Sequence, residues 1–256
     1  MARLFDDAST QFLTTSNGIA SIPFTMACWF KTDADGVSQS LMSPTNTASA
    51  NNYFRLDVRM DIAGDPVTIT SIDGTVAEGG ETTTGVTINT WNHACGVFAS
   101  TTSRSVYLNG GSKATSTNFD SPSGQNRCDI GTVYTGGASY LHMSGSIAEA
   151  AMWGVALTDA EVAILALGYS PLLVRPQSLV AYWPLIGRTS PEIDLVGGYD
   201  LTLVNAPTTA AHPRIIYPPN MQSGLTIPGA PPAGAIMPQF QYANLGASLY
   251  NGTLIG

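Results

Sequence analysis

Side chains able to do acid–base chemistry are sparse in this sequence. Its 256 residues include only five glutamates, at positions 78, 81, 149, 161 and 192, and three histidines, His93, His142 and His212. Cleavage of a glycosidic bond needs two carboxyl groups held together, one to protonate the leaving oxygen and one to attack the sugar or activate water. The histidines are far apart in the sequence, and no pair has the spacing of metal ligands. These residues favour a protein without a catalytic centre.

One of the glutamates has a structural explanation. Thr158 and Glu161 have the spacing of a capping box, in which each side chain accepts a hydrogen bond from the backbone of the other residue. The apolar residues that follow predict a short helix over 160–167, and Gly168 suits the left-handed conformation that ends a helix. An apolar strand precedes this helix and a return strand is expected at 179–185, in a chain that otherwise has β character.

Residues 53–62 show the clearest strand pattern. Apolar side chains alternate there with the charged residues Arg55, Asp57, Arg59 and Asp61. We expect a half-buried strand whose charged face forms ion pairs across to neighbouring strands.

Short strands and turns recur along the first 135 residues. Asn109-Gly110 predicts a type I′ turn, because both central residues of that turn need positive φ, and a further turn is predicted at 78–81. A first pair of strands is expected within 3–13, and other strands are expected at 24–31, 67–72, 91–99, 104–108 and 130–134. This spacing predicts an antiparallel sandwich of two sheets.

Three segments, in order, resemble one known family. They are IPFTMACWFK at 22–31, TWNHACGVFASTTSRSVYLNGG at 90–111, and the GSIAE run at 145–149 with the helix after it. The chain resembles the laminin-G-like, concanavalin-A-like jelly-roll family over roughly residues 3–185. The resemblance implies an all-β, antiparallel two-sheet jelly-roll sandwich with one short helix, and it says little about function, because this fold hosts many functions.

The sequence after the return strand allows two domain organisations. Residues 186–205 either complete the sandwich as added edge strands or begin a second module that is cut short. We predict one sandwich domain over 1–205 and an extended, neutral, Pro-rich C-terminal arm over 206–256.

The resemblance also bears on catalysis and metals. Glycosidases of this fold carry a Glu-x-Asp-x-x-Glu strand, which this chain lacks, and the family context implies a structural role for Glu149. We therefore predict no catalytic residues and no cofactor. Relatives often bind Ca²⁺ on the sandwich rim through Asp oxygens, but no dense Asp motif occurs here, so calcium is kept open and no ligands are named.

Sugar binding on this fold uses exposed aromatic rings beside Asn or Asp. Tyr53, which follows Asn51-Asn52, and Tyr134 and Tyr140, which flank Gly136-Gly137, are the candidate glycan-binding residues. The alternative is that each packs at a strand end.

Composition narrows the partners. The net charge of −8 argues against direct nucleic-acid binding, which needs a basic surface. The first residues lack the pattern of a secretory signal, and no stretch has the roughly 18 apolar residues of a membrane span. We expect synthesis in a host cytoplasm without a signal peptide and no membrane partner.

The three cysteines do not suggest a disulfide framework, because their number is odd and their spacing wide. We expect Cys28, Cys95 and Cys128 to be free and packed as small apolar residues. A single Cys28–Cys95 bridge is the alternative, if their strands are neighbours.

The arm is unusual because it contains no Asp, Glu, Lys or Arg after Arg214. Disordered tails are usually charged and poor in apolar residues, whereas this one is neutral and apolar. It either wraps over its own domain or docks on another subunit. The residues predicted to bind a partner are Ile215, Ile216, Tyr217, Ile236, Met237, Phe240, Tyr242, Leu245, Leu249 and Tyr250.

These features lead to a first hypothesis of a non-enzymatic virion structural protein. The fold is of a type common outside cells, yet the sequence has no secretory signal. It also has no set of catalytic residues, and its arm needs a partner surface. These three features fit a bacteriophage capsid decoration or cement protein. It would lie on the virion surface as a homo-oligomer, with a trimer as the expected form, and bridge copies of the major capsid protein or other virion proteins through its arm. The alternative is a carbohydrate- or receptor-binding module of a phage tail or fibre that holds surface glycans, and a glycosidase is the third and least favoured hypothesis.

Overall fold

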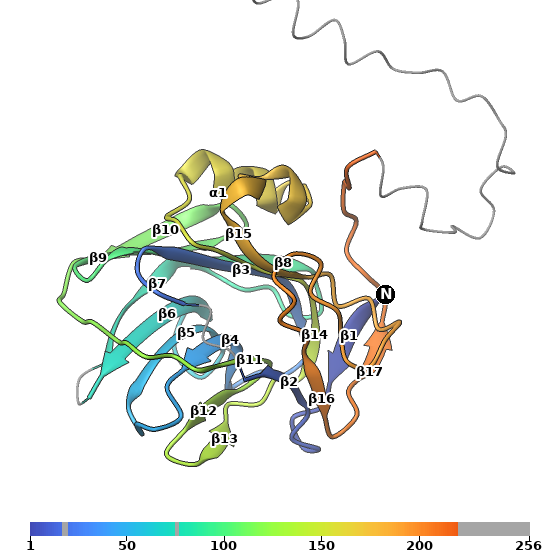
Figure 1. Cartoon of the computed structure of the whole chain (residues 1–256), viewed down its shortest axis with the longest axis horizontal. Coiled ribbons are helices and arrows are strands. Elements are labelled where there is room, and N and C mark those ends of the chain that lie inside the picture. Colours follow the sequence, from blue (N-terminus) through green and yellow to red (C-terminus); the bar gives the residue numbers. More distant parts are fainter. Residues whose placement is uncertain (17–19, 75–76, 220–256) are drawn as a thin grey trace, which may run out of the picture. The chain divides into compact units, whose positions relative to one another are not determined.

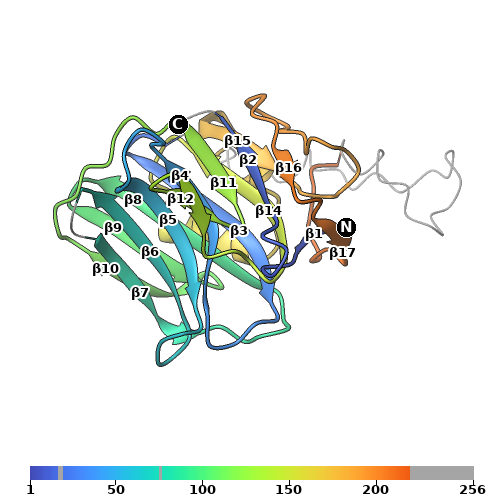
Figure 2. The same cartoon turned by 90° about the horizontal axis from the view of Figure 1, so that it is seen from below.

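The computed structural model describes residues 1–16, 20–74 and 77–219. Two antiparallel sheets pack face to face, and one short helix lies on the outside of the first (Figures 1 and 2). Among the described residues this confirms the predicted all-β sandwich with one short α-helix, and two 3-10 helices, Pro171–Leu173 and Pro176–Ser178, follow that helix. Among the described residues, no helix combines the length and apolar character needed to span a bilayer.

The first sheet, sheet A, is built around two long strands, β3 and β14, which pair over most of their length. Strands β1 and β15 follow one another along the other edge of β14. The strands of sheet A are, in spatial order, β10 (Gly111–Ser116), β9 (Ser103–Leu108), β8 (Asn92–Ser100), β3 (Phe24–Thr32), β14 (Gly145–Trp153), β1 (Ala2–Phe5) and β17 (Thr208–Ala210), with β15 (Leu179–Trp183) beside β14.

The second sheet, sheet B, has seven strands among the described residues. A small separate hairpin, β12 (Val133–Thr135) and β13 (Ala138–Tyr140), follows one of its strands. The strands of sheet B are, in order, β16 (Thr202–Val204), β2 (Phe12–Thr15), β11 (Arg127–Ile130), β4 (Ser38–Thr45), β5 (Asn52–Arg59), β6 (Pro66–Asp73) and β7 (Ala77–Gly85).

The main core lies between the sheets and follows the period-two alternation. Phe24, Phe54 and Phe98 meet there, with Phe24 and Phe98 stacked at 4.6 Å between ring centroids. A second apolar layer lies between the outer face of sheet A and helix α1 (Asp159–Ala166), and Ala27 and Trp153 belong to it. Strand β3 is therefore buried on both faces, as sheet strands covered by a helix are.

The three cysteines are free and buried. The register places Cys95 opposite Ala27, so Cys95 packs in the layer under α1 while Cys28 packs between the sheets. The alternative Cys28–Cys95 bridge is excluded in this fold because the two side chains lie on opposite faces of sheet A.

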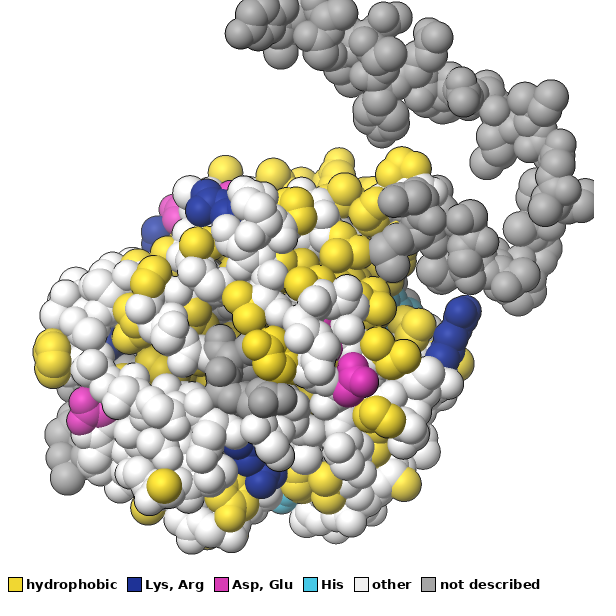
Figure 3. Space-filling view, viewed as in Figure 1, with side chains coloured by type: hydrophobic (Ala, Val, Ile, Leu, Met, Phe, Trp, Pro, Cys, Tyr) yellow, Lys and Arg dark blue, Asp and Glu magenta, His cyan; other side chains and the backbone are white. Residues whose placement is uncertain are grey.

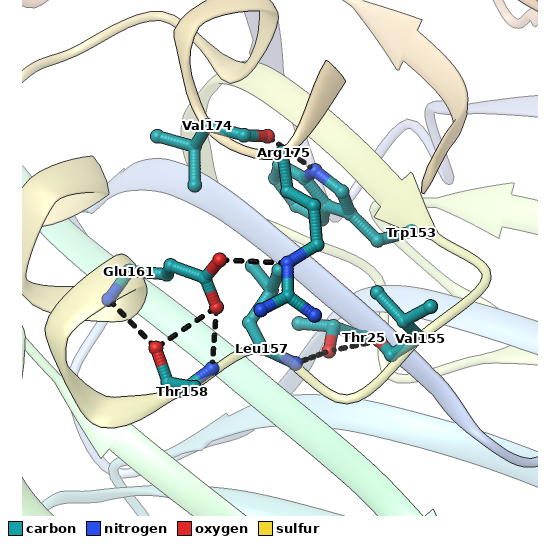
Figure 4. Close-up of polar contacts among 8 residues, drawn as sticks. All are labelled: Thr25, Trp153, Val155, Leu157, Thr158, Glu161, Val174 and Arg175. Atoms are coloured by element: carbon teal, nitrogen blue, oxygen red, sulfur yellow. Dashed lines mark hydrogen bonds and ion pairs between the residues drawn. The ribbon is translucent and has the colours of Figure 1, made fainter. Parts of the chain in front are cut away.

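Helix α1 begins with the predicted capping box. The Thr158 hydroxyl accepts from the Glu161 backbone N–H at 3.4 Å, and the Glu161 carboxylate accepts from the Thr158 N–H at 2.8 Å (Figure 4). Arg175 binds the other oxygen of Glu161 at 2.7 Å and ties the helix start to the chain that follows it. The helix ends before Gly168, whose φ of +89° confirms the expected left-handed stop.

One predicted turn is wrong. Residues 78–81 lie inside strand β7, where the register pairs Gly79 with Thr70 and Gly80 with Ile69. A Cβ on Gly79 would lie 1.9 Å from the carbonyl oxygen of Ile69. The glycine therefore serves a close approach of two strands, which is the other common reason for glycine in a β region. The predicted turn at Asn109-Gly110 is confirmed, with φ of +53° and +75°.

The chain after the return strand adds an edge strand to each sheet. Strand β16 pairs with β2 at the edge of sheet B, as the first alternative for residues 186–205 expects. Strand β17 lies beyond the predicted boundary at 205 and pairs with β1 of sheet A. The division into a sandwich and an arm stays a prediction.

Candidate functional site

The outer face of sheet B, which is the face turned away from sheet A, carries the charged side of β5. Phe54, Leu56 and Val58 fill the core, so the alternate residues Arg55, Asp57 and Arg59 point outward. The expectation of ion pairs across strands was wrong. Arg55 Nε lies 2.5 Å from Asp57 and Arg59 Nε lies 2.8 Å from Asp61, so each pair joins residues two apart on one chain.

The register explains this pairing. The residues opposite Asp57 are Ser40 on β4 and Thr68 on β6, and the residue opposite Arg55 on β6 is Thr70. None of these carries a charge. Residues two apart in a strand share a face, so the long arginine side chains reach the acid next along their own chain.

A polar row crosses the outer face from β4 to β7. The register aligns Ser40, Asp57, Thr68 and Glu81 directly across four strands. Ser40 and Asp57 are fully buried and Thr68 is 5% exposed. The Asp57 carboxylate is paired with Arg55, whereas the Thr68 hydroxyl has no hydrogen-bond partner. A buried hydroxyl without a partner is unfavourable by about 1–3 kcal/mol, so Thr68 is a position where an incoming polar group would be stabilised.

A groove of about 200 Å³ lies at the β7 end of this row. Arg59 and Glu81 line it together with Thr68 and Thr70, and Gly79 contributes only backbone. Because a Cβ on Gly79 would collide with Ile69, the groove depends on a glycine at this position.

The electrostatics of the groove follow from its ion pairs. The hydrogen bond to Asp61 raises the pKa of Arg59, and the same bond lowers the pKa of Asp61. Burial raises the pKa of Asp57, and the nearby Arg55 opposes that effect. Glu81 forms no ion pair within the described part of the chain. The groove thus offers guanidinium donors, one accessible carboxylate acceptor and two hydroxyls, a set that matches the hydroxyl groups of a sugar.

The three candidate tyrosines gather at the β12–β13 hairpin. Contacts with β4 and β5 place this hairpin on the outer face of sheet B (Figures 1 and 2). Tyr53 lies under it, 9% exposed, and packs with Ile72 and Val133. Tyr53 therefore packs at a strand end, as the alternative for this residue expected.

The other two tyrosines are on the hairpin itself. Tyr134 is half-buried, and the Arg127 guanidinium lies 4.2 Å from its ring centroid. Tyr140 is 52% exposed, and its backbone pairs with that of Val133. Of the three predicted residues, Tyr140 presents the most open ring on the face that carries the groove.

The described part of the arm makes contacts within its own chain. Ile216 pairs with Tyr169 next to α1, and the Tyr217 hydroxyl donates to Glu149 at 2.7 Å. Ile215 is half-buried. The other predicted partner-binding residues lie outside the described residues, namely Ile236, Met237, Phe240, Tyr242, Leu245, Leu249 and Tyr250.

Apolar side chains are exposed around α1, on the side of the molecule seen at the top of Figure 3. Leu167 is 73% exposed, and Ile164, Tyr169, Leu173 and Ile216 are also open to solvent. An exposed apolar patch often marks an interaction surface. Of these residues only Ile216 belongs to the predicted partner-binding set, and its contact with another subunit stays a prediction.

Glu149 is the centre of a buried network on sheet A. Its carboxylate accepts from the Tyr182 hydroxyl at 2.6 Å and lies 3.2 Å from Nε2 of His212. Burial, followed by the charge of Glu149, raises the pKa of both Tyr182 and Tyr217. The network joins β14, β15 and residues 212–217, which agrees with the structural role that the resemblance implied. Sequence reasoning missed His212 and Tyr182 because their partner is distant along the chain.

The remaining histidines and acids do not gather. His93 is buried beside Trp29, and burial lowers its pKa to about 3, while His142 lies near Phe12. Within residues 1–16, 20–74 and 77–219, no group of three or more His, Cys, Asp or Glu side chains is arranged to hold a metal ion. Calcium binding on the sandwich rim, which the sequence left open, stays untested.

A second hollow, of about 320 Å³, lies on the rim between residues 20–22 and 121–125. Its lining is uncharged, and Asn52 and Asn46 hold the neighbouring backbone of Ser123 with hydrogen bonds of 3.0 and 3.1 Å. None of its lining residues has a buried unpartnered polar atom like the Thr68 hydroxyl on sheet B.

Residues 6–163 match the family described as the concanavalin A-like lectin/glucanases superfamily. The sequence has no significant match among curated proteins.

Several solved structures share the fold. A putative carbohydrate binding protein from Bacteroides ovatus is 20% identical, with a TM-score of 0.57 over 81% of this chain and 61% of that one. The carbohydrate-binding module CBM40 of the Ruminococcus gnavus IT-sialidase is 16% identical, with a TM-score of 0.52 over 65% and 97% of the two chains. Domain 4 of the Geobacillus stearothermophilus arabinanase AbnA, solved with arabinotriose, is 21% identical, with a TM-score of 0.51 over 60% and 72%. The chain thus spans less than two thirds of the Bacteroides protein.

Proposed function

Because this chain belongs to the concanavalin A-like lectin/glucanase superfamily, we propose that it is a non-catalytic carbohydrate-binding module. Its ligand lies in the groove on the outer face of sheet B, between Arg59 and Glu81. This is the alternative that the sequence left beside a virion role, and the geometry of the described residues favours it.

The observation that carries the proposal is the unpartnered hydroxyl of Thr68 in a groove that Arg59 and Glu81 also line. Thr68 has a buried hydroxyl without a hydrogen bond, and Arg59 and Glu81 stand on either side with donors and an acceptor. A sugar hydroxyl both donates and accepts, so one ring can satisfy all three groups. Small-molecule sites usually orient their ligand through a few precisely positioned polar groups.

The carboxylates of this face support binding without cleavage. Hydrolysis needs two carboxyl groups that both reach the glycosidic bond. Asp57 is fully buried and ion-paired with Arg55, which leaves Glu81 as the accessible acid among the residues that line the groove. A single accessible carboxylate can accept hydrogen bonds from a sugar but cannot supply both roles.

The similar structures support carbohydrate as the class of ligand. Their descriptions name a putative carbohydrate binding protein, a carbohydrate-binding module and a domain in complex with arabinotriose. They bear on the class of ligand and do not indicate which residues of this chain bind it.

Thr68→Val tests the proposal with little change in shape. Valine removes the unpartnered hydroxyl, so the free energy of unfolding should stay equal or rise, while binding loses one hydrogen bond. Since such a bond contributes about 1 kcal/mol, affinity for a glycan chosen from an array should fall about fivefold. Isothermal titration calorimetry measures the affinity, and urea denaturation measures the stability.

The matched control is Thr208→Val, an exposed threonine on the edge strand β17 of sheet A. Its affinity should equal that of the unaltered protein. Unchanged affinity in Thr68→Val would mean that the glycan does not bind in this groove. If the protein binds no glycan on a broad array, the proposed function itself is wrong.

A virion role is the second candidate, and the observation that favours it is the absence of charged residues after Arg214. In this reading the chain is a decoration protein on the virion surface, made in the host cytoplasm, whose arm holds virion proteins or copies of itself. Deletion of residues 220–256 keeps the contacts of Tyr217 with Glu149. We expect the full chain to form an oligomer, a trimer in this proposal, and the shortened chain to be a folded monomer by light scattering. Equal masses for the two chains would contradict an arm that joins subunits.

A further inference from the structure

We propose that the groove on sheet B selects neutral glycans and excludes sugars that carry a carboxylate, such as sialic acids and uronic acids. This inference rests on the proposed function and names the ligand class of the same site. It follows from the charges that face the groove and from the partners that each charge already has.

The first charge is the guanidinium of Arg59. Asp61 binds it through two hydrogen bonds, from Nε at 2.8 Å and from Nη2 at 2.9 Å. A planar guanidinium recognises a carboxylate through two such parallel bonds. Asp61 therefore occupies the Nε–Nη2 edge of Arg59 and balances its charge, so the pair has no net charge and only the Nη1 side remains to donate to a ligand.

The other arginines of this face are paired in the same way. Arg55 lies 2.5 Å from Asp57, and Arg127 lies 2.8 Å from Asp129, in each case two residues along the same strand. Both acids are fully buried and cannot leave their partners for solvent. No guanidinium on the outward faces of β5 and β11 is left to neutralise a ligand carboxylate among the residues that the structure describes.

Glu81 then determines the sign of the net charge in the groove. It lines the groove opposite Arg59, directly across from Thr68, and takes part in no ion pair in the described segments. The groove therefore contains one carboxylate that no cation of the described residues pairs with. A ligand carboxylate brought near Glu81 meets repulsion and gains no compensating pair.

A neutral sugar meets no such penalty. Two neighbouring hydroxyls can donate to the two oxygens of Glu81, and another can accept from or donate to the hydroxyls of Thr68 and Thr70. Specificity of this kind comes from an unfavourable element against the wrong ligand as much as from attraction to the right one.

The test uses a glycan array in which each neutral oligosaccharide stands beside the same oligosaccharide capped with sialic acid or a uronic acid. The unaltered protein should bind the neutral member of its preferred pair at least about tenfold better at low salt, which is the effect expected for two like charges roughly 12 Å apart at an effective dielectric near 20. Added salt should narrow the difference, because exposed charges are screened. Glu81→Gln keeps the shape, removes the charge and should reduce the preference to less than about threefold.

The matched control is Asp159→Asn, the same change of a carboxylate into an amide on α1, which covers the outer face of sheet A. It should leave the preference between the two glycans unchanged. Stronger binding of the acidic member, or a preference that Glu81→Gln does not alter, overturns the inference and leaves carbohydrate binding intact. Absence of binding to every glycan overturns both.

Discussion

Replacing Asp194 with alanine is expected to lower the free energy of unfolding by about 3–5 kcal/mol, because hydrogen bonds to a charged group contribute about 1.5–3 kcal/mol each and their donors would be left unpaired. The Asp194 side chain is 6% exposed, and its carboxylate accepts four backbone N–H groups. One comes from Tyr182 on β15 at 2.8 Å, and the others come from residues 196, 197 and 199. Alanine would leave these donors without partners and free the loop from the sheet.

Urea denaturation checks this expectation, and for a domain of this size the melting temperature should fall by about 10 °C. Asp200→Ala is the control, because the Asp200 side chain is exposed and accepts one hydrogen bond, from the Asp194 N–H at 2.9 Å. It should cost less than about 1.5 kcal/mol. A loss below 1 kcal/mol in Asp194→Ala would mean that the loop is held by other contacts, such as the bond from Trp183 to the Tyr199 carbonyl.

The second large effect concerns binding. The double variant Arg59→Ala with Glu81→Ala should weaken glycan binding by about 100-fold or more, since hydrogen bonds to charged groups contribute about 1.5–3 kcal/mol each. The fold should tolerate it, because the Arg59–Asp61 pair is partly exposed, with side chains 29% and 33% open, and such pairs contribute little. Calorimetric titration with the preferred neutral glycan measures the effect.

A matched control removes an ion pair from the other side of the molecule. Lys113 and Asp159 form an exposed pair at 2.8 Å over the outer face of sheet A. Lys113→Ala with Asp159→Ala should bind the glycan as the unaltered protein does. Equal losses in both double variants would point to a general effect on the fold and against a site on sheet B.

Much of the fold could be predicted because its signals are local. The alternation in 53–62 and the capping box at Thr158 and Glu161 each lie within a few residues of sequence. The strand β4 was missed, because its sequence SQSLMSPT has polar residues and a proline where an apolar pattern is expected. Its serines face the outer surface of sheet B, where Ser40 joins the polar row.

The candidate site was harder to predict because it is made by register. Glu81 was assigned to a turn on account of two glycines, and the structure places it opposite Thr68 inside a strand pair. The charged face of β5 was recognised, but its partners were not, since only the register shows that uncharged residues lie across from it. The tyrosines were found from their glycine and asparagine neighbours, and the fold brings them to one hairpin while burying Tyr53.

The most direct test of the central claim is the position of a bound glycan. Backbone amide and side-chain methyl resonances can be followed by NMR while the preferred neutral glycan is added to the full chain. We predict shift changes centred on Arg59, Thr68, Thr70 and Glu81, with Tyr140 affected where the ligand extends toward the hairpin. Changes confined to the rim at 121–125 or to the region of α1, with the outer face of sheet B silent, would contradict the account.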